Sequence, residues 1–432
     1  MLFRHFRFSR RRVACAVAYA AACAAALGAV QAAPLSFDNA LRLAQQRSHQ
    51  LPAFSAAAAA AREMAVAAAQ RPDPVLKAGI NNLPVDGPDR LSLTSDFMTM
   101  RSVGVMQEFT NAAKLGARAA RFDREAEAAE AGRQSALAGL QRDTAIAWLE
   151  RHYQERILEA LHVLRAEAAL QIDAAQAAYR GARGSQADVF AARAGLAQID
   201  DRVAQAERQV AIARTQLARW VGEAAAEPLG DAPALAQVHL SSEGIDAQLA
   251  HHPQIEALRT REAVAQAEVE LARANQQTDL SAELMFSQRG PAYSNMVSFN
   301  VAIPLQWDRA KRQDREHAAR LAMAQQLQAE RAEATRAHAA EALTMLLEWR
   351  SHRDRLARYD VTLLPLAGER TQAALAAYRG ATGALGAVLE ARRAEIDTRI
   401  ERLRLESDAA RLWAQLEFLA PAADRAIAPV RP

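Results

Sequence analysis

Cysteine is nearly absent from this chain of 432 residues, which contains only Cys15 and Cys23. Both lie in an N-terminal segment where arginines precede a weakly apolar, alanine-rich stretch and a small-residue cleavage motif. This pattern predicts an export signal peptide over residues 1–32. The mature chain would then contain no thiol, which excludes disulfides and thiolate metal sites.

Positive charge is also in short supply once the signal peptide is removed. Its five arginines account for the basic character, and without them the formal net charge changes from +3 to −2. We therefore predict no nucleic-acid partner. After residue 32 the sequence has no run of about 18 apolar residues, so it predicts no transmembrane helix.

Glycine (18 residues), proline (15 residues) and aromatic residues (5%) are scarce, whereas alanine is abundant. This composition is typical of long helices. The sequence contains no Walker A loop, no Gly-x-Ser-x-Gly motif and no His-Glu-x-x-His motif. We expect no enzyme activity, no cofactor and no resident metal site.

One octapeptide occurs twice, at residues 177–184 and 376–383, with seven of eight positions identical. A long helical pattern enters each copy and another leaves it. Each copy therefore predicts the tip of a helical hairpin, where paired glycines end one helix and allow the chain to reverse. The return arm of the first hairpin has an apolar period of 3.5 residues, as in a coiled coil.

The whole plan of the chain also repeats. The predicted parts are a signal peptide (1–32), a first repeat (33–235) with a β-hairpin (75–109) and a tip (179–186), a second repeat (236–420) with a β-hairpin (279–305) and a tip (378–385), and a flexible tail (421–432). The predicted long helices are 36–70, 111–179, 242–277 and 309–378, the last interrupted only at Pro365.

The predicted strands are roughly ten residues long, the length of an outer-membrane β-strand. The second hairpin alternates most regularly, with an apolar row of Val297, Phe299, Val301, Ile303 and Leu305. Four strands are too few to close a barrel, so the barrel must be shared between subunits. The alternative is a soluble coiled-coil protein with two short ordinary sheets.

These features resemble the TolC-like outer-membrane efflux family. The resemblance rests on the duplicated plan, on Tyr179-Arg180-Gly181 and Tyr378-Arg379-Gly380 at the tips, and on strand-to-helix junctions such as Gln107–Asn111. It implies a mainly α-helical fold with a membrane β-barrel portion. A homotrimer would form a 12-stranded barrel in Gram-negative outer-membrane lipid, continued by an α-helical tunnel into the periplasm.

The resemblance also implies a role in a tripartite efflux system, with a periplasmic adaptor (membrane fusion protein) and an inner-membrane pump of the RND type. The stretch over residues 82–109 is similar to the branch that exports heavy-metal cations. The alternative is a channel for multidrug or other organic compounds. A periplasmic adaptor would itself have one helical hairpin flanked by lipoyl-like segments. This sequence has two hairpins and no lipoyl-like segments.

Two sets of candidate functional residues follow from the resemblance. The candidate adaptor-docking residues at the tips are Tyr179, Arg180, Gly181, Gly184, Tyr378, Arg379, Gly380 and Gly383. The candidate periplasmic gate is Asp188 with Glu390, since a ring of carboxylates at a constriction favours cations. The alternative for both carboxylates is ordinary helix-surface charge.

Two further groups have metal-binding chemistry. Met98, Met100 and Met106 carry soft thioether ligands suited to Cu(I) or Ag(I), although their strand positions favour lining of lipid or lumen. His251 and His252 precede a proline at a predicted helix start, which favours capping or a surface pair over a metal site.

Overall fold

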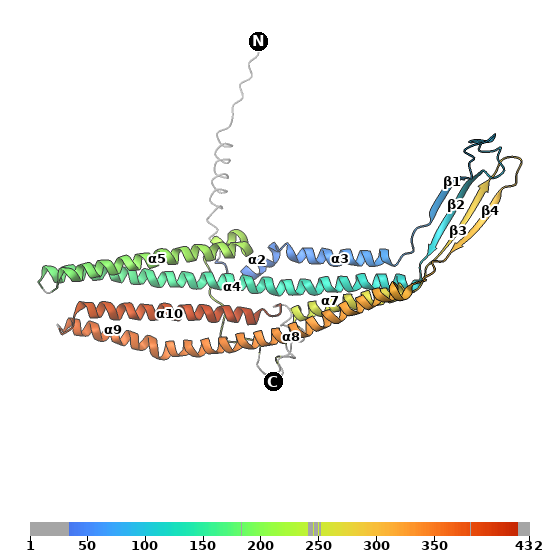
Figure 1. The fold of residues 1–432 in the computed structure, drawn as a ribbon. Helices are drawn as coiled ribbons and strands as arrows, with labels where there is room; N and C mark the ends of the chain where they lie inside the picture. Colours follow the sequence, from blue (N-terminus) through green and yellow to red (C-terminus); the bar gives the residue numbers. More distant parts are fainter. Residues whose placement is uncertain are drawn as a thin grey trace, which may run out of the picture. The chain divides into compact units, whose positions relative to one another are not determined.

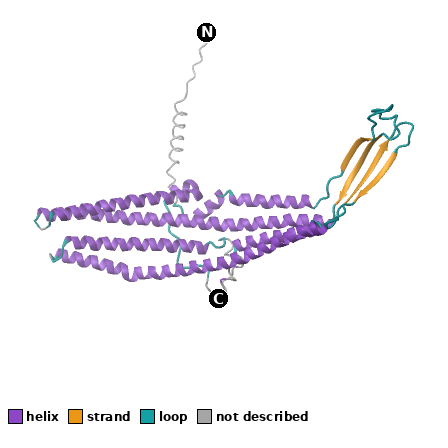
Figure 2. Ribbon diagram, viewed as in Figure 1, coloured by secondary structure: helices purple, strands orange, loops and turns teal. Residues whose placement is uncertain are grey.

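The computed structural model describes residues 34–182, 184–240, 245, 249, 252–380 and 382–421. The predicted signal peptide and the tail beyond Pro421 lie outside these residues. The described chain is mostly helical and has one small antiparallel sheet (Figure 2). No helix among the described residues is both long and apolar enough to cross a membrane.

A strand pair, a long helix and a return helix occur twice in this order (Figure 1). The elements are α2 (Phe37–Arg47), α3 (Gln50–Ala68), β1 (Val75–Asn81), β2 (Met100–Phe109), α4 (Ala112–Arg180), α5 (Gln186–Val221), η1 (Gly222–Ala226), α7 (Pro253–Ala274), β3 (Leu280–Gln288), β4 (Met296–Ala302), η2 (Arg309–Lys311), α8 (Gln313–Arg358), η3 (Tyr359–Leu363), α9 (Leu364–Arg379) and α10 (Leu385–Glu417). At about 1.5 Å per residue, α4 is roughly 100 Å long.

Two predicted helices are broken in the structure. The helix expected over 36–70 is divided into α2 and α3, because Pro52 lies in the first turn of α3 and has no N–H to continue the bonding of α2. The helix expected over 309–378 passes through the π-helical turn η3 before Pro365. A proline removes one hydrogen-bond donor, and a wider turn accommodates the loss.

The strands are shorter than predicted at four of their ends, because the sequence pattern extended them to Leu83, Met98, Asp279 and Leu305. β1 ends at Asn81 and β4 ends at Ala302, so Ile303 and Leu305 lie outside the sheet. Pro304 lacks the N–H that a further ladder bond would need. The four strands contain 7, 10, 9 and 7 residues.

The chain divides into two compact units, and α4 contributes to both. The described part of the first unit comprises residues 34–44, 147–234 and 362–407, apart from residues 183 and 381. Its core is formed by α4, α5 and α10, which bury the side chains of Ile157, Leu161, Leu164, Ala168, Ile199, Val203, Ala206, Ile396, Ile400 and Leu403. The apolar period predicted for the return arm, α5, is therefore confirmed.

The second unit contains the sheet, in the order β1-β2-β3-β4 with every neighbour antiparallel. The two strand pairs predicted from sequence form one sheet because β2 pairs with β3, for example Val105 with Leu284. Lys114, at the start of α4, forms an ion pair of 2.6 Å with Asp279 just before β3. This contact joins the long helix to the base of the sheet.

Candidate functional site

One face of the sheet is mainly apolar across all four strands, and its polar members, Arg101, Gln107 and Gln288, lie toward the strand ends. Residues directly opposite each other in the register share a face, so the alternation of each strand extends to its neighbours. The large apolar residues of this face are Leu76, Ile80, Val103, Val105, Phe109, Leu280, Leu284, Phe286, Val297, Phe299 and Val301. All of them are between 38% and 71% exposed. A soluble domain would bury such a face against another layer.

The opposite face is polar. Lys77 forms an ion pair of 3.2 Å with Glu283 across this face. Asn81 donates a hydrogen bond of 2.9 Å to the Ser102 hydroxyl, and Ser287 is buried on the same side. The sheet therefore has one mainly apolar face and one more polar face, the alternation found in membrane β-strands.

The two edges of the sheet are unpaired. β1 and β4 each have one neighbour, and no described residue of the chain supplies a further strand. Unpaired edge N–H and C=O groups are ready to pair with another strand, and they are not tolerated in lipid.

The first hairpin tip lies between α4 and α5, with Arg183 outside the described residues. Gly181 N donates to Ala177 O at 3.0 Å, and Ala182 then takes a left-handed conformation with φ of 53°. Tyr179 is half exposed, and the Arg180 side chain donates to Gln176 O at 3.4 Å. The helix ends just before Gly181, as predicted, but the left-handed residue of the turn is Ala182 and not a glycine.

The second tip lies between α9 and α10, with Ala381 outside the described residues. Gly380 has a φ of −78°, which any residue can adopt. The chain is turned by three hydrogen bonds to Ala377 O, from Thr382 N, Gly383 N and the Thr382 hydroxyl. Tyr378 is half-buried and Arg379 is exposed.

Glycine is needed at both tips for close packing instead. A Cβ on Gly184 would lie 3.2 Å from the Cβ of Ala178, and a Cβ on Gly383 would lie 3.0 Å from that of Ala377. Both separations are tighter than ordinary van der Waals contact. The two tip glycines therefore let the returning chain pass close to the end of the incoming helix.

The two candidate gate carboxylates have different partners. Asp188 completes a capping box at the start of α5, because its Oδ2 accepts from Ser185 N and from the Ser185 hydroxyl, both at 2.8 Å. These bonds, the backbone one above all, lower the pKa of the exposed Asp188 carboxyl. Glu390 lies on α10 and accepts from Arg370 of α9 at 3.1 Å. Both carboxylates lie beside their tips, and each has a local structural role.

A polar contact between the two hairpins was missed in the sequence. Arg392 of α10 binds both oxygens of Glu167 of α4, with Nε 2.6 Å from Oε2, and also Glu395 at 2.8 Å. The hydrogen bonds to Glu167 raise the pKa of Arg392, although burial opposes the shift. No local motif marks this contact, because Glu167 and Arg392 come from different repeats.

The residues with metal-binding chemistry are not gathered together. Met100 and Met106 lie on the polar face of β2, roughly 20 Å apart at about 3.3 Å per residue, and Met98 lies in the preceding loop. His252 caps α7, as expected, whereas His251 lies outside the described residues. Within the described ranges no group of three or more His, Cys, Asp or Glu residues is placed to hold a metal ion.

No protein-family model and no curated protein matches this sequence. Solved structures do match its fold. The outer-membrane channel OprN has a TM-score of 0.75 and 18% identity, over 89% of this chain and 90% of that chain.

The fold is that of outer-membrane channels. The outer-membrane protein VceC from Vibrio cholerae has a TM-score of 0.72 and 19% identity, over 89% of this chain and 95% of that one. CusC, whose structures concern transmembrane channel formation, has a TM-score of 0.75 and 15% identity, over 90% and 93% of the two chains. Across all three, nearly the whole described chain shares the arrangement of helices and strands.

Proposed function

We propose that this chain is the outer-membrane channel of a tripartite efflux system. The observation that carries the proposal is the one-sided apolar sheet with two unpaired edges. Three chains would join β1 to β4 and give a closed barrel of twelve strands, with the apolar face toward lipid and the polar face toward the lumen. The helices would continue this barrel as a periplasmic tunnel.

The proposed membrane face is tested by two neighbouring residues of β4. Phe299 lies on the apolar face, and Ser298 lies on the polar one. Phe299→Arg places a charge in lipid, at a cost of roughly 2–4 kcal/mol near the bilayer midplane. We expect this variant to lose heat-modifiable, assembled protein from the outer-membrane fraction, and Ser298→Arg to retain it. Equal behaviour of the two variants would contradict the membrane assignment.

We further propose that both tips dock on a periplasmic adaptor, and that an inner-membrane pump drives transport. Support comes from the exposed Tyr179, Arg180 and Arg379 at the ends of the hairpins. An alanine at Gly380 meets nothing closer than 3.4 Å, so it fits without moving the chain. The double variant with Gly181→Ala and Gly380→Ala should still assemble but should export less substrate. Unchanged export would contradict the assignment of the tips to the docking surface.

Asp188 and Glu390 are proposed as the periplasmic gate. In a trimer each exposed carboxylate would occur three times near the tunnel end, and such rings favour cations. The test is the cation selectivity of single channels formed by the purified protein. Glu390→Gln and Asp188→Asn should lower cation selectivity, whereas Asp173→Asn, an exposed carboxylate further from the tip, should not.

Heavy-metal cations are the proposed substrates, on the strength of the resemblance over residues 82–109, and organic compounds are the alternative. Growth of the native host without this gene separates them. Sensitivity to Cu, Ag, Zn, Co, Cd or Ni salts, restored by the intact gene, would support metal export. Sensitivity to drugs and dyes alone would assign the channel to organic compounds and leave its fold unaffected.

A further inference from the structure

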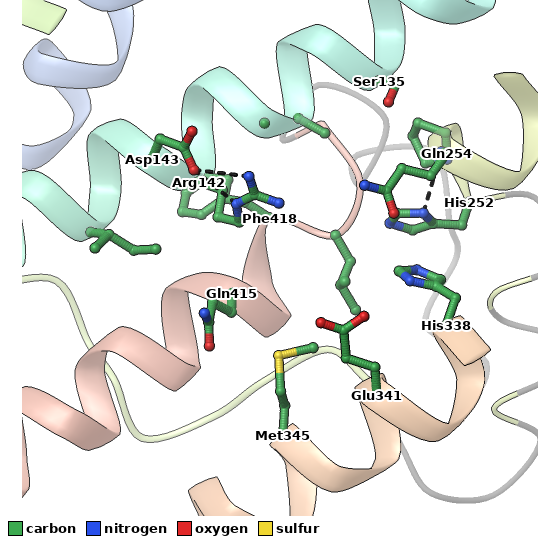
Figure 3. A pocket seen from close by; sticks show the side chains of 15 residues that line it. Ser135, Arg142, Asp143, His252, Gln254, His338, Glu341, Met345, Gln415 and Phe418 are labelled. Atoms are coloured by element: carbon green, nitrogen blue, oxygen red, sulfur yellow. Dashed lines mark hydrogen bonds and ion pairs between the residues drawn. The ribbon is translucent and has the colours of Figure 1, made fainter. Parts of the chain in front are cut away.

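The buried His252 and the half-buried His338 face each other in a cavity of about 430 Å³ in the second unit (Figure 3). His252 precedes α7, and His338 belongs to α8. Their ring centroids are 4.4 Å apart, with the ring planes tilted by 43°. His252 is only 6% exposed. The pair therefore joins the start of α7 to the middle of α8.

His252 acts as the N-cap of α7. Its Nδ1 accepts a hydrogen bond from Gln254 N at 3.4 Å, and Pro253 follows in the first helical position. Since Nδ1 accepts, the proton of the neutral ring lies on Nε2. The Nε2 atoms of both His252 and His338 are buried without a hydrogen-bond partner. In this tautomer Nε2 carries the proton, and the neutral ring caps α7 through Nδ1.

The charged groups around the pair come from two helices. Arg142 and Asp143 of α4 form their own ion pair, with Nε of Arg142 2.9 Å from Oδ1 of Asp143. Glu341 of α8 lies one turn beyond His338 and lines the same cavity. The lining contributed by α10 and the segment after it is uncharged and consists of Gln415, Phe418 and Leu419.

These surroundings disfavour protonation of the two histidine rings. Burial lowers the pKa of His252 to about 4, helped by His338 and Arg142 and opposed by the Leu419 carbonyl, which lies outside hydrogen-bond geometry. Burial also lowers the pKa of His338, and Glu341 opposes that shift. Both rings are therefore neutral at pH 7.

We propose that the His252–His338 pair is an acid-sensitive switch that releases the first turns of α7 when the pH falls. A proton on Nδ1 of His252 converts the acceptor of the cap into a donor that faces the Gln254 N–H. It also places a positive charge at a helix N-terminus and beside Arg142 and His338. The ion pairs of 2.6 Å between Arg331 and Glu262 and 2.7 Å between Arg320 and Glu268 hold the rest of α7 on α8.

The sign of the pH effect follows from the lowered pKa. In the released state His252 is solvated and titrates near 6.5, so that state binds more protons between pH 6.5 and about 4. The stabilising contribution of the neutral ring is complete above pH 6.5 and is lost as the pH falls to about 4. For His252 alone, release should be about 20-fold more favourable at pH 5 than at pH 7.

Hydrogen exchange of the full-length protein tests the switch. Protection of the amides of residues 255–262 is measured at pH 7 and pH 5 and corrected for the intrinsic effect of pH on exchange. We expect protection to fall by about 20-fold, while residues 199–206 of α5, which contain no histidine, change little. A change below about threefold at residues 255–262 would overturn the proposal.

Variants separate the switch from general acid sensitivity. His252→Asn keeps a favoured N-cap acceptor but cannot be protonated, so the pH response should fall below about threefold. His49→Asn is the matched control, because His49 is also an N-cap but is exposed and makes no side-chain cap bond. It should respond as the unmodified protein does.

If His252→Asn does not assemble, His338→Gln provides the second test, because it retains the cap and removes the neighbouring imidazole. The pKa of His252 should then rise, and release should begin at a higher pH. A full response in His252→Asn, an unshifted response in His338→Gln, or a lost response in His49→Asn would each overturn the switch. The outcome does not depend on the channel assignment.

Discussion

At the first hairpin tip the chain turns through the left-handed Ala182, and α5 starts with the Ser185–Asp188 capping box. At the second tip the chain turns on Ala377 O, and Ala384 precedes α10 where the first repeat has Ser185. An exposed ion pair between Arg370 and Glu390 joins the arms there instead. The glycines shared by the two tips allow the close packing of both turns. The residues that differ between the tips decide how stable the first turn of each return helix is.

This comparison assigns different roles to nearly identical sequences. A capping box satisfies two backbone N–H groups locally. An exposed ion pair contributes about 0.2–1 kcal/mol and is weakened by salt. The first return helix is therefore fixed at its start by a side-chain cap, which Ala384 does not offer to the second.

The largest expected effect concerns Arg392 and Arg193, which occupy equivalent positions in the two repeats. Arg392→Ala removes both bonds to Glu167 and leaves the buried Glu395 with Arg399 alone among its arginine partners, so local stability near the second tip should fall by about 2 kcal/mol. Its counterpart Arg193 is exposed, and Arg193→Ala should have little effect. Hydrogen exchange in α10 measures the difference. Equal losses in the two variants would show that the hairpins are not joined at Arg392.

The next effect concerns the glycines. Gly383→Ala brings its Cβ 3.0 Å from the Cβ of Ala377 and should cost about 1–2 kcal/mol in local stability. Gly380→Ala is the control within the same turn, where φ is −78° and the nearest atom is 3.4 Å away. It should be neutral or slightly stabilising. Exchange protection of the first turn of α10 ranks the two, and the reverse order would contradict the packing role.

A smaller effect is expected for the cap of the first tip. Ser185→Ala removes the side-chain acceptor for Asp188 N and should cost about 1 kcal/mol in stability at the start of α5. The amides of residues 187–190 should then lose protection.

The second tip allows the opposite experiment, in which a cap is added instead of removed. Ala384 and Ala387 occupy the positions of Ser185 and Asp188, so Ala384→Ser combined with Ala387→Asp should install the capping box. The first turn of α10 should gain protection. If the double variant loses protection instead, the tips differ in backbone geometry as well as in side chains.

The smallest effect is the response of the first tip to acid. The pKa of Asp188 lies below its usual value of 3.8, so its stabilising contribution is present above pH 3.8 and is lost as the pH falls through the lowered pKa. Carbon-13 NMR of the labelled Asp188 carboxyl should give this lowered pKa. Ser185→Ala should move it back toward 3.8, and an unchanged value would contradict the capping box.

The sequence predicted the helical hairpins, both strand pairs and the alternation of the sheet, because these depend on periodic patterns in one segment. Val203 in the return arm α5 and Phe299 in β4 lie where the patterns indicate. The register between β2 and β3 was not predictable, since it joins strands from different repeats. The Arg392–Glu167 contact was not predicted for the same reason, since its two residues also come from different repeats.

Local backbone geometry accounts for the remaining differences. Nothing in a glycine pattern reveals that Gly383 is needed for close approach, or that Ala182 takes the left-handed conformation. The break at Pro52 could have been predicted, because a proline favours the first turn of a new helix. The docking and gate roles of the tip residues stay predictions.

If three chains form the proposed barrel, the unpaired edges of the sheet also have a genetic consequence. In a three-chain barrel every subunit closes the edges of its two neighbours, so no subunit can be lost without opening the wall. If normal and edge-defective chains are made in equal amounts and mix freely, only about one trimer in eight contains three normal chains. A defect in β1 or β4 should therefore be dominant over a normal copy of the gene.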